Sequence, residues 1–489
     1  MTKHLNEKIT SLVISPGSGE FIYSPLIIYD KDNTPLNANS NSTKSNILLT
    51  IEQLKHDFPN LKNVSLLVGW FANKVEANNI SIVPKVETSV PVQGEDWQVG
   101  KYTRNTAKLV SQVNGKPSWG GTPNDKSVVE VCELLKANGY NITLYPILFV
   151  DQPNKPWRGF IHATSDQEIE HFFYEYTKFI MHYTTLEYES KKLKDYISSF
   201  IIGSKFKDLL KYRSSNNEFL AVEKLILLAN KVKSEVGKKV KLTYAANWDE
   251  YHHTDNGWHH LDSLWASDNI DYIGINAYFP LTDNLPQENI SYDIIKEGWE
   301  SGEYYDYIKN KNGKQIPIKP DWAIKNIEYW WKNYHYNPDV KVTKWRPKLK
   351  PIIFTEIGFP SIDGCTNQPN LYIDLTTSNT KLPPNSKGLV DYKAQQIALE
   401  ATLDYWQDKE SKQGNIGLIG DKGAFVYSID ARYDFYNWPK NYADTENYKY
   451  GHWVKLNSTP DLNASSFNFA IPSLIIISIC VIIMAYKAR

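Results

Sequence analysis

The sequence predicts an α/β protein of the (β/α)₈, or TIM-barrel, class, and three observations lead to this prediction. Short apolar runs rich in β-branched residues alternate with longer helix-like runs, which is typical of a parallel sheet flanked by helices. Eight strand-like runs favour a closed barrel. The chain has 489 residues, whereas such a barrel alone needs about 250, so long insertions are expected. An open doubly wound sheet is the alternative, but no glycine-rich phosphate loop follows the first strand.

The expected elements follow one another along most of the chain. The first strand is expected within Ser11–Ser15 or Phe21–Tyr29. The other seven expected strands are Val64–Gly69, Ile142–Val150, Phe200–Gly203, Lys241–Ala246, Tyr272–Asn276, Ile352–Thr355 and Ala424–Ser428. The expected helices are Leu48–His56, Lys126–Asn138, Asp166–Lys191, Leu220–Val236, Trp322–Trp331 and Tyr392–Trp406. Long connections at 73–125 and 277–320 are expected on the face that carries function in such barrels.

Composition narrows the function classes. The 54 Lys and Arg balance 55 Asp and Glu, so no nucleic-acid partner is expected. The 15 Trp and 32 Tyr suit stacking on sugars, although most such rings fill cores. The cysteines Cys132, Cys365 and Cys480 are far apart and show no metal spacing, so neither a disulfide framework, a metal nor a cofactor is expected.

The C-terminal region predicts a membrane anchor. Residues 467–486 carry no charge and as a helix span about 30 Å, enough for a bilayer core. A buried helix is the alternative, but the run is apolar on every face. We expect residues 1–456 to form the barrel, 457–466 a linker and 467–486 a transmembrane helix. Because no signal peptide is evident at the N-terminus, the barrel is expected on the cytoplasmic side.

Polar and aromatic residues follow the ends of most expected strands. At the C-terminal ends of barrel strands such residues indicate function more often than structure. We expect Trp70, Trp157, Trp248 and Tyr278 to line one pocket. The full set of candidate binding residues is Trp70, Asp151, Trp157, Arg158, Asn247, Trp248, Asp249, Asn276, Tyr278, Asp430 and Arg432.

Glu356 is the sharpest candidate for chemistry. It directly follows the expected strand Ile352–Thr355, so its carboxylate is expected to project into the barrel mouth. This position suits a glycosidase nucleophile or one member of an acid/base pair. A buried salt bridge is the structural alternative.

Long motifs in a fixed order carry a family resemblance. They include Lys350–Pro360 (KPIIFTEIGFP), Val64–Phe71 (VSLLVGWF), Leu242–Tyr251 (LTYAANWDEY) and Ile270–Asp283 (IDYIGINAYFPLTD). Together they resemble the TIM-barrel-like domain of gene transfer agents and phage tail proteins over about residues 15–456. The pattern is also similar to β-mannanase-like glycoside hydrolases of clan A, whose catalytic pair are glutamates at the ends of strands four and seven. The resemblance implies that Glu356 occupies the nucleophile position.

The chain departs from this pattern at the fourth strand. Both families end that strand with Gly-Ser/Thr-Glu, whereas this chain has Gly203-Ser204-Lys205, so the resemblance places Lys205 at the acid/base position. A retaining mechanism needs two carboxyl groups about 5–5.5 Å apart. An ammonium beside Glu356 is expected to form an ion pair instead, and hydrolysis is therefore expected to be weak or lost.

Three functions remain open from the sequence. The first is a barrel that binds peptidoglycan or a surface polysaccharide, with tail-assembly proteins as further partners in a phage-like particle. The second is an active retaining glycoside hydrolase in which another carboxylate replaces the missing acid. The third is a membrane-anchored scaffold. The candidate replacement acids are Asp151, Asp249, Glu250 and Asp430.

Overall fold

The computed structural model describes residues 4–15, 18–38, 43–113, 115–283, 290–371 and 381–430. They belong to the first of two units, Met1–Trp453. The expected linker 457–466, the expected membrane helix 467–486, Arg432 and Cys480 lie outside the described residues. Within the described ranges, no helix is both long enough and apolar enough to span a bilayer.

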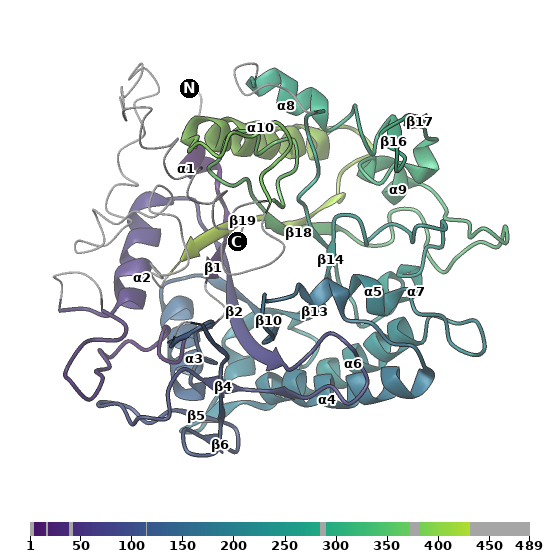
Figure 1. Cartoon of the computed structure of the whole chain (residues 1–489). Helices are drawn as coiled ribbons and strands as arrows, with labels where there is room; N and C mark the ends of the chain where they lie inside the picture. Colours follow the sequence, from purple (N-terminus) through teal and green to yellow (C-terminus); the bar gives the residue numbers. More distant parts are fainter. Residues whose placement is uncertain are drawn as a thin grey trace, which may run out of the picture. The chain divides into compact units, whose positions relative to one another are not determined.

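Eight parallel strands form a closed barrel, as the sequence predicts (Figure 1). The barrel closes because β1 pairs in parallel with both β2 and β19, and the remaining strands pair with their neighbours in chain order. The eight strands are β1 (Ser11–Ser15), β2 (Asn63–Ala72), β10 (Asn141–Val150), β13 (Ile197–Ser204), β14 (Lys241–Asn247), β15 (Ile273–Asn276), β18 (Ile352–Ile357) and β19 (Ile419–Asp430).

Helices follow the barrel strands and pack outside them (Figure 1). Their neighbouring pairs include α4 with α6 and α8 with α10. The α-helices are α1 (Leu5–Lys8), α2 (Asn46–Asp57), α3 (Asp125–Ala137), α4 (Asp166–Thr185), α5 (Lys207–Leu210), α6 (Leu220–Val236), α7 (Asp262–Trp265), α8 (Tyr292–Gly298), α9 (Ile327–Lys332) and α10 (Tyr392–Ser411). Short 3₁₀ helices are η1 (Arg158–Phe160), η2 (Leu193–Asp195) and η4 (Pro320–Trp322).

Short strands build up the connections between these elements. The connection from β2 to α3 holds the largest number of them, and β3 within it extends the sheet by pairing antiparallel to β2. The short strands are β3 (Ile82–Val83), β4 (Lys85–Val86), β5 (Gln98–Val99), β6 (Tyr102–Thr103), β7 (Lys108–Leu109), β8 (Gln112–Val113), β9 (Lys116–Pro117), β11 (Glu187–Tyr188), β12 (Lys191–Lys192), β16 (Tyr307–Lys309) and β17 (Gln315–Pro317). The expected long insertions are therefore present.

The core has two layers, because successive residues of a strand point to opposite faces. The larger layer lies between strands and helices. The smaller layer fills the barrel and is formed by Val13, Leu67, Tyr145, Ile201, Ala245 and Phe425. The strands have buried residues on both faces, which explains why they read as continuous apolar runs.

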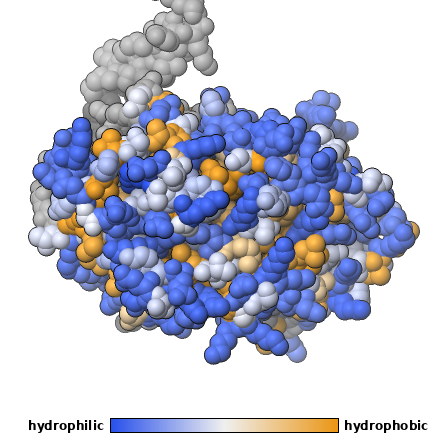
Figure 2. Space-filling view, turned by 90° about the horizontal axis from the view of Figure 1, so that it is seen from below, coloured by the Kyte–Doolittle hydropathy of each residue, from blue (hydrophilic) through white to orange (hydrophobic). Residues whose placement is uncertain are grey.

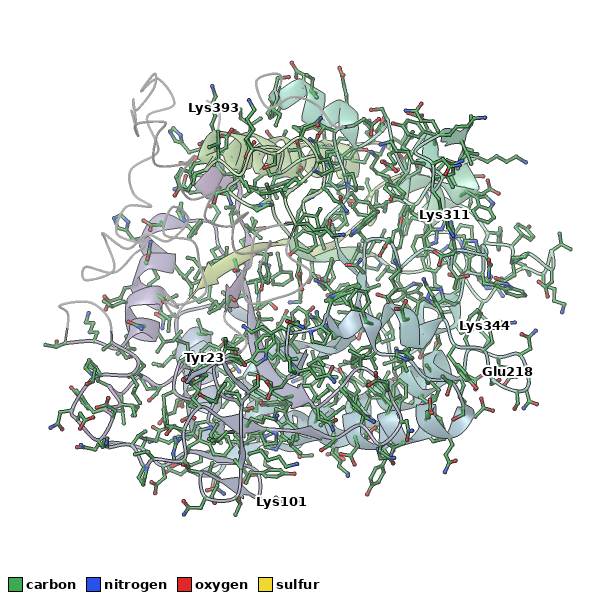
Figure 3. All side chains as sticks on the ribbon, viewed as in Figure 1. Tyr23, Lys101, Glu218, Lys311, Lys344 and Lys393 are labelled. Carbon is green, nitrogen blue, oxygen red and sulfur yellow. The ribbon has the colours of Figure 1, made fainter. Side chains whose placement is uncertain are left out.

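One face of the molecule is predominantly polar. Figure 2 shows one face on which hydrophilic residues surround small, scattered apolar patches. Lys101 and Lys311 are both exposed, and Lys101 lies at the lower edge of the molecule in Figure 3. Tyr23, by contrast, is fully buried, and its hydroxyl donates a 2.6 Å hydrogen bond to the Leu67 carbonyl.

One of the two alternatives for the first strand is confirmed, and two expected helices have other bounds than those observed. The first barrel strand is Ser11–Ser15, and Phe21–Tyr29 forms no strand. The helix expected to reach Lys191 ends at Thr185, because Leu186 leaves the helical conformation with a ψ angle of 124°. Farther along, Glu189 and Ser190 adopt positive φ angles of 48° and 67°. That backbone suits a tight hairpin turn, here between β11 and β12. The helix expected from Trp322 begins at Ile327, where the Asn326 side chain accepts a hydrogen bond from the Tyr329 amide.

Candidate active site

Irregular pairing shapes the ends of the strands that carry Glu356 and Lys205. Along β15 and β18, Ile275 pairs with Phe354 but the next residue, Asn276, pairs with Glu356, so one extra residue is inserted in β18. Along β13 and β14 the pairing also shifts before Ser204. A bulge of this kind re-aims the side chain that follows it. Both side chains are thereby directed to the same point.

Glu356 is held by three donors at the floor of the barrel mouth. The Lys205 ammonium lies 2.9 Å from Oε2, and the Tyr278 hydroxyl donates to the same oxygen at 2.8 Å. The Tyr145 hydroxyl donates to Oε1 at 2.9 Å. No carboxylate occurs among the hydrogen-bond and ion-pair partners of Glu356 in the part of the chain that is described. The expected ion pair with Lys205 is confirmed.

Lys205 reaches this position with a costly backbone conformation. Its φ angle is 55°, in the left-handed region that non-glycine residues rarely adopt. Its amide nevertheless donates to the Ala245 carbonyl at 3.0 Å, which keeps the residue attached to β14. Its ammonium also lies 5.2 Å from the centroid of the Tyr278 ring. The surrounding contacts therefore fix Lys205 at the end of the fourth strand.

Electrostatics at this pair favour the ionised form of Glu356. Burial raises the pKa of the Glu356 carboxyl, but the Lys205 ammonium and the Arg158 guanidinium outweigh burial and hold that pKa below its usual value. Burial lowers the pKa of Lys205, and the Glu356 carboxylate opposes that change. Burial also raises the pKa of the Tyr145 and Tyr278 hydroxyls well above the usual value. Both phenols therefore remain protonated donors to a carboxylate.

Arg158 and Asn276 support the same floor. The Arg158 Nε donates to the carbonyl and the hydroxyl of Ser204, both at 3.0 Å. Asn276 donates to the Tyr145 hydroxyl at 3.3 Å and accepts from Thr355 at 2.7 Å. These contacts fix the end of β13 and orient Tyr145 toward Glu356.

The candidate replacement acids lie in other environments. Asp249 is paired with Lys207 at 2.5 Å, and the Asn247 side-chain amide donates to its other oxygen at 2.5 Å. Glu250 is 1% exposed and accepts from the Tyr244 hydroxyl at 2.7 Å and from the Asn247 amide at 2.8 Å. Burial raises the pKa of Glu250 to about 7. Tyr244 belongs to the layer between strands and helices, so Glu250 faces that layer.

Asp151 anchors the long connection between β2 and α3. Its carboxylate lies 2.6 Å from the Lys85 ammonium and accepts from the Ser111 amide at 3.0 Å and 3.1 Å. Asp430 pairs through its backbone with Ser15. The Asp430 side chain and Arg432 lie outside the described part, so their roles stay predictions.

The tryptophans expected in one pocket occupy different places. Trp70 packs behind β2, with its ring 5.2 Å from that of Phe179 on α4. Trp248 is 4% exposed and packs against Phe279 and Tyr304. Trp157 is half-buried and lies over Gly159, where an added Cβ would meet the ring at 2.2 Å. Of the four aromatic residues, only Tyr278 contacts Glu356 in the contacts described.

A second aromatic group was missed by the sequence reasoning. The ring of Trp119 lies 4.8 Å from Phe149 and 6.2 Å from Phe71, and the Lys155 ammonium lies 4.5 Å from the Trp119 centroid. Phe71 lies four residues after the interior residue Leu67 on β2, and Phe149 lies four residues after the interior residue Tyr145 on β10. Because every second residue of a strand points to the same face, Phe71 and Phe149 also point to the barrel axis, above Tyr145. Their inward direction follows from the register with Leu67 and Tyr145, which only the structure provides.

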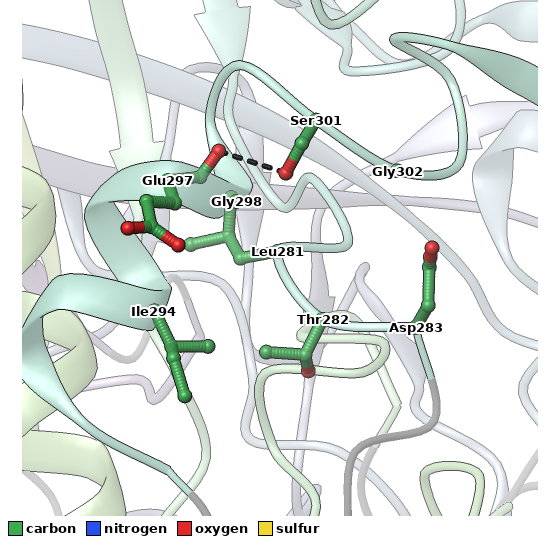
Figure 4. A pocket seen from close by; sticks show the side chains of 8 residues that line it. All are labelled: Leu281, Thr282, Asp283, Ile294, Glu297, Gly298, Ser301 and Gly302. Atoms are coloured by element: carbon green, nitrogen blue, oxygen red, sulfur yellow. Dashed lines mark hydrogen bonds between the residues drawn. The ribbon is translucent and has the colours of Figure 1, made fainter.

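Two small surface cavities lie elsewhere. One, of about 200 Å³, lies between the segment after β15 and α8 (Figure 4). It is lined by Leu281, Thr282, Asp283, Ile294, Glu297, Gly298, Ser301 and Gly302. Figure 4 shows the Ser301 hydroxyl donating to the Glu297 carbonyl, at 2.9 Å. None of the lining residues contacts Glu356 in the described contacts.

Comparison with known families agrees with this architecture. The model of the GTA TIM-barrel-like domain matches residues 174–439, more than half of the chain. The chain belongs to this family. The matched region includes Lys205, Tyr278 and Glu356. No curated protein matches the sequence at a significant level.

Several solved structures of glycoside hydrolases are also similar to this chain. A GH113 β-1,4-mannanase is 13% identical, with 92% of this chain and 99% of that chain covered and a TM-score of 0.46. The GH113 β-mannanase AaManA from Alicyclobacillus acidocaldarius is 14% identical, with 91% and 95% covered and a TM-score of 0.44. The GH53 catalytic domain of Ignisphaera aggregans is 10% identical, with 87% of each chain covered and a TM-score of 0.38.

Proposed function

We propose that this barrel binds a glycan at its mouth and hydrolyses glycosidic bonds weakly or not at all. The observation that carries the proposal is the 2.9 Å contact between Lys205 and Glu356. A retaining hydrolase needs a second carboxyl group that donates a proton to the leaving oxygen. The partner that meets Glu356 here is an ammonium instead.

The contacts of Glu356 weaken it as a nucleophile as well. Both oxygens accept hydrogen bonds, and the nearby positive charge lowers the pKa of the carboxyl. A less basic carboxylate attacks carbon more slowly. The loss of a positioned acid/base costs about 10²–10⁴ in rate. The geometry therefore suits retention of a ligand better than its cleavage.

The binding surface is proposed to join a polar floor to an aromatic wall. Glu356 and Lys205 offer charged groups to sugar hydroxyls, and Trp119, which is half-buried, offers a ring face. Aromatic rings suit the apolar faces of sugars. The proposed ligand is peptidoglycan or a β-linked surface polysaccharide.

Co-sedimentation of the full-length chain with these glycans tests the proposal. The protein is incubated with insoluble peptidoglycan and with β-linked polysaccharides, and both bound protein and released reducing ends are measured. Retention without release is expected. Protein that stays in solution with every glycan contradicts binding, and rapid release of reducing ends contradicts the loss of hydrolysis.

Membership of the gene transfer agent family supports a place in a phage-like tail assembly, where a glycan-binding barrel would meet the cell envelope. The apolar run at 467–486 supports a second location, in which the barrel, residues 1–456, is tethered to a membrane through the linker 457–466. Both assignments are proposals that rest on the sequence.

A further inference from the structure

A buried cluster of histidines and one aspartate lies away from Glu356. His259 and Asp262 stand at the start of α7, and His335 follows α9. One nitrogen of each histidine and one oxygen of Asp262 all lie within 4.8 Å of one another. We propose that His259, Asp262 and His335 bind one divalent transition-metal ion, Zn²⁺ by preference, which ties the segment after β14 to the segment before β18.

Hydrogen bonds to main-chain carbonyls fix the tautomer of both histidine rings in the form that can bind a metal. His335 Nε2 lies 2.7 Å from the Trp330 carbonyl, and His259 Nδ1 lies 2.9 Å from the His252 carbonyl. A carbonyl only accepts, so each of these ring nitrogens carries a proton. In the neutral ring the other nitrogen then has a free lone pair. This arrangement is typical of zinc-bound histidines.

The contact between His335 and Asp262 needs a positive charge near it. His335 Nδ1 lies 2.9 Å from Asp262 Oδ2, and Thr343 also donates to that oxygen. With Nε2 protonated and the ring neutral, Nδ1 and Oδ2 are both acceptors. A bound cation removes their repulsion by coordinating both. A second proton on His335 is the alternative, and the experiment below separates the two.

Unpartnered polar atoms surround the same point. Asp262 is 1% exposed, and its Oδ1 has no hydrogen-bond partner within the described ranges. His252 is also 1% exposed and neither ring nitrogen has a partner there. Its ring centroid lies 5.4 Å from that of His259. Buried polar atoms left without partners are costly, and a metal ion would satisfy Asp262 and draw in His252 or a water as the fourth ligand.

The chemistry of the donors favours zinc. Nitrogen and carboxylate ligands at about 2.0–2.2 Å in a tetrahedron are typical of Zn²⁺. Trp330 and Trp345, which stack near His335 at 4.8 Å and 5.5 Å, shield the cluster from water. A structural role follows from this enclosure.

Metal content and thermal stability of the full-length chain test the site. The chain is purified without a histidine tag, stripped with EDTA and titrated with Zn²⁺ by calorimetry. One ion per chain and a higher Tm with Zn²⁺ are expected, because a ligand that binds only the folded state stabilises it. Co²⁺ should give the visible absorption of a tetrahedral site.

Two variants and a matched control decide between a metal site and a hydrogen-bonded cluster. His259→Gln and Asp262→Asn should weaken Zn²⁺ binding by more than about tenfold, since even outer partners of ligands contribute 10–100-fold. His182→Gln breaks a separate, partly buried His–Asp contact, 2.8 Å from His182 Nε2 to Asp125, and should leave binding unchanged. Substoichiometric binding by the unmodified chain, or equal weakening by His259→Gln and His182→Gln, overturns the proposal.

Discussion

Two buried glutamates show how the surroundings of a single residue set its charge. Glu356 has Lys205 at 2.9 Å, and positive charge holds its pKa below the usual value. Glu250 accepts from Tyr244 and from the Asn247 amide, yet burial dominates and raises its pKa to about 7. The charged contact at Glu356 was expected because the family resemblance places Lys205 and Glu356 at the paired positions that end strands four and seven. Tyr145 was missed because it lies within a strand, where apolar runs hide an inward-facing hydroxyl.

Glu250 makes the stability of the barrel depend on pH. In an unfolded chain a glutamate ionises near pH 4.3, whereas the folded pKa is about 7. Between these values the folded state binds more protons, so the free energy of unfolding falls as the pH rises through this window, by an amount on the order of 3 kcal/mol. Glu250→Gln should remove this contribution to the decrease in the free energy of unfolding with pH. Denaturant unfolding at pH 5 and pH 8 measures it.

An exposed glutamate gives the control for this effect. Glu223 lies on the exposed side of α6, so Glu223→Gln should keep the pH dependence of the unmodified chain. If Glu250→Gln keeps it as well, Glu250 does not retain its proton in the folded state.

At the scale of the elements, one step along a strand separates a residue that packs against a helix from a residue that faces the barrel axis. Trp70 and Phe71 are neighbours on β2, but Phe71 points to the barrel axis and Trp70 packs on Phe179 of α4. Shifting a strand by one residue exchanges its faces. The residues of β2 are buried on both faces of the strand. The sequence therefore lacks the alternation of apolar and polar residues that would have marked which residues face inward. The strand was predictable and the direction of its side chains was not.

Alanine at Trp119 should therefore affect glycan binding, whereas alanine at Trp70 should affect stability. Trp119→Ala should weaken glycan binding by roughly 1–3 kcal/mol if its ring stacks on sugar, with the fold intact. Trp70→Ala should lower the free energy of unfolding by about 3–5 kcal/mol through a core cavity. The affinity of its folded fraction should stay unchanged. Binding isotherms and denaturant unfolding of both variants give the comparison, and a loss of affinity with Trp70→Ala alone contradicts the placement.

The whole barrel was predictable because its order follows the chain. Each barrel strand pairs with its neighbours in the sequence, and the last strand pairs with the first. The alternation of strands and helices along the chain was therefore enough to predict the topology. Contacts between distant segments were not accessible in the same way. Asp262 and His335 are 73 residues apart, and no spacing rule for metal ligands joins them.

The apolar run 467–486 leads to a prediction for the complete chain. The full-length protein should remain with membranes after alkaline carbonate washing, because about 20 apolar residues are enough to span a bilayer. A variant that ends at residue 460 should appear in the soluble fraction. Release of the full-length protein by carbonate contradicts insertion.

The central claim is that Lys205 in place of a carboxyl group silences a glycosidase-like site. Its most direct test is the release of reducing ends from β-linked polysaccharides by the unmodified chain, Lys205→Glu, and Lys205→Glu with Glu356→Gln. Two adjacent carboxylates raise the pKa of one of them, as a general acid requires. We predict weak or no release by the unmodified chain, a gain with Lys205→Glu, and loss of that gain when Glu356→Gln is added. Robust release by the unmodified chain that survives Glu356→Gln would contradict the account and place the chemistry on other carboxylates.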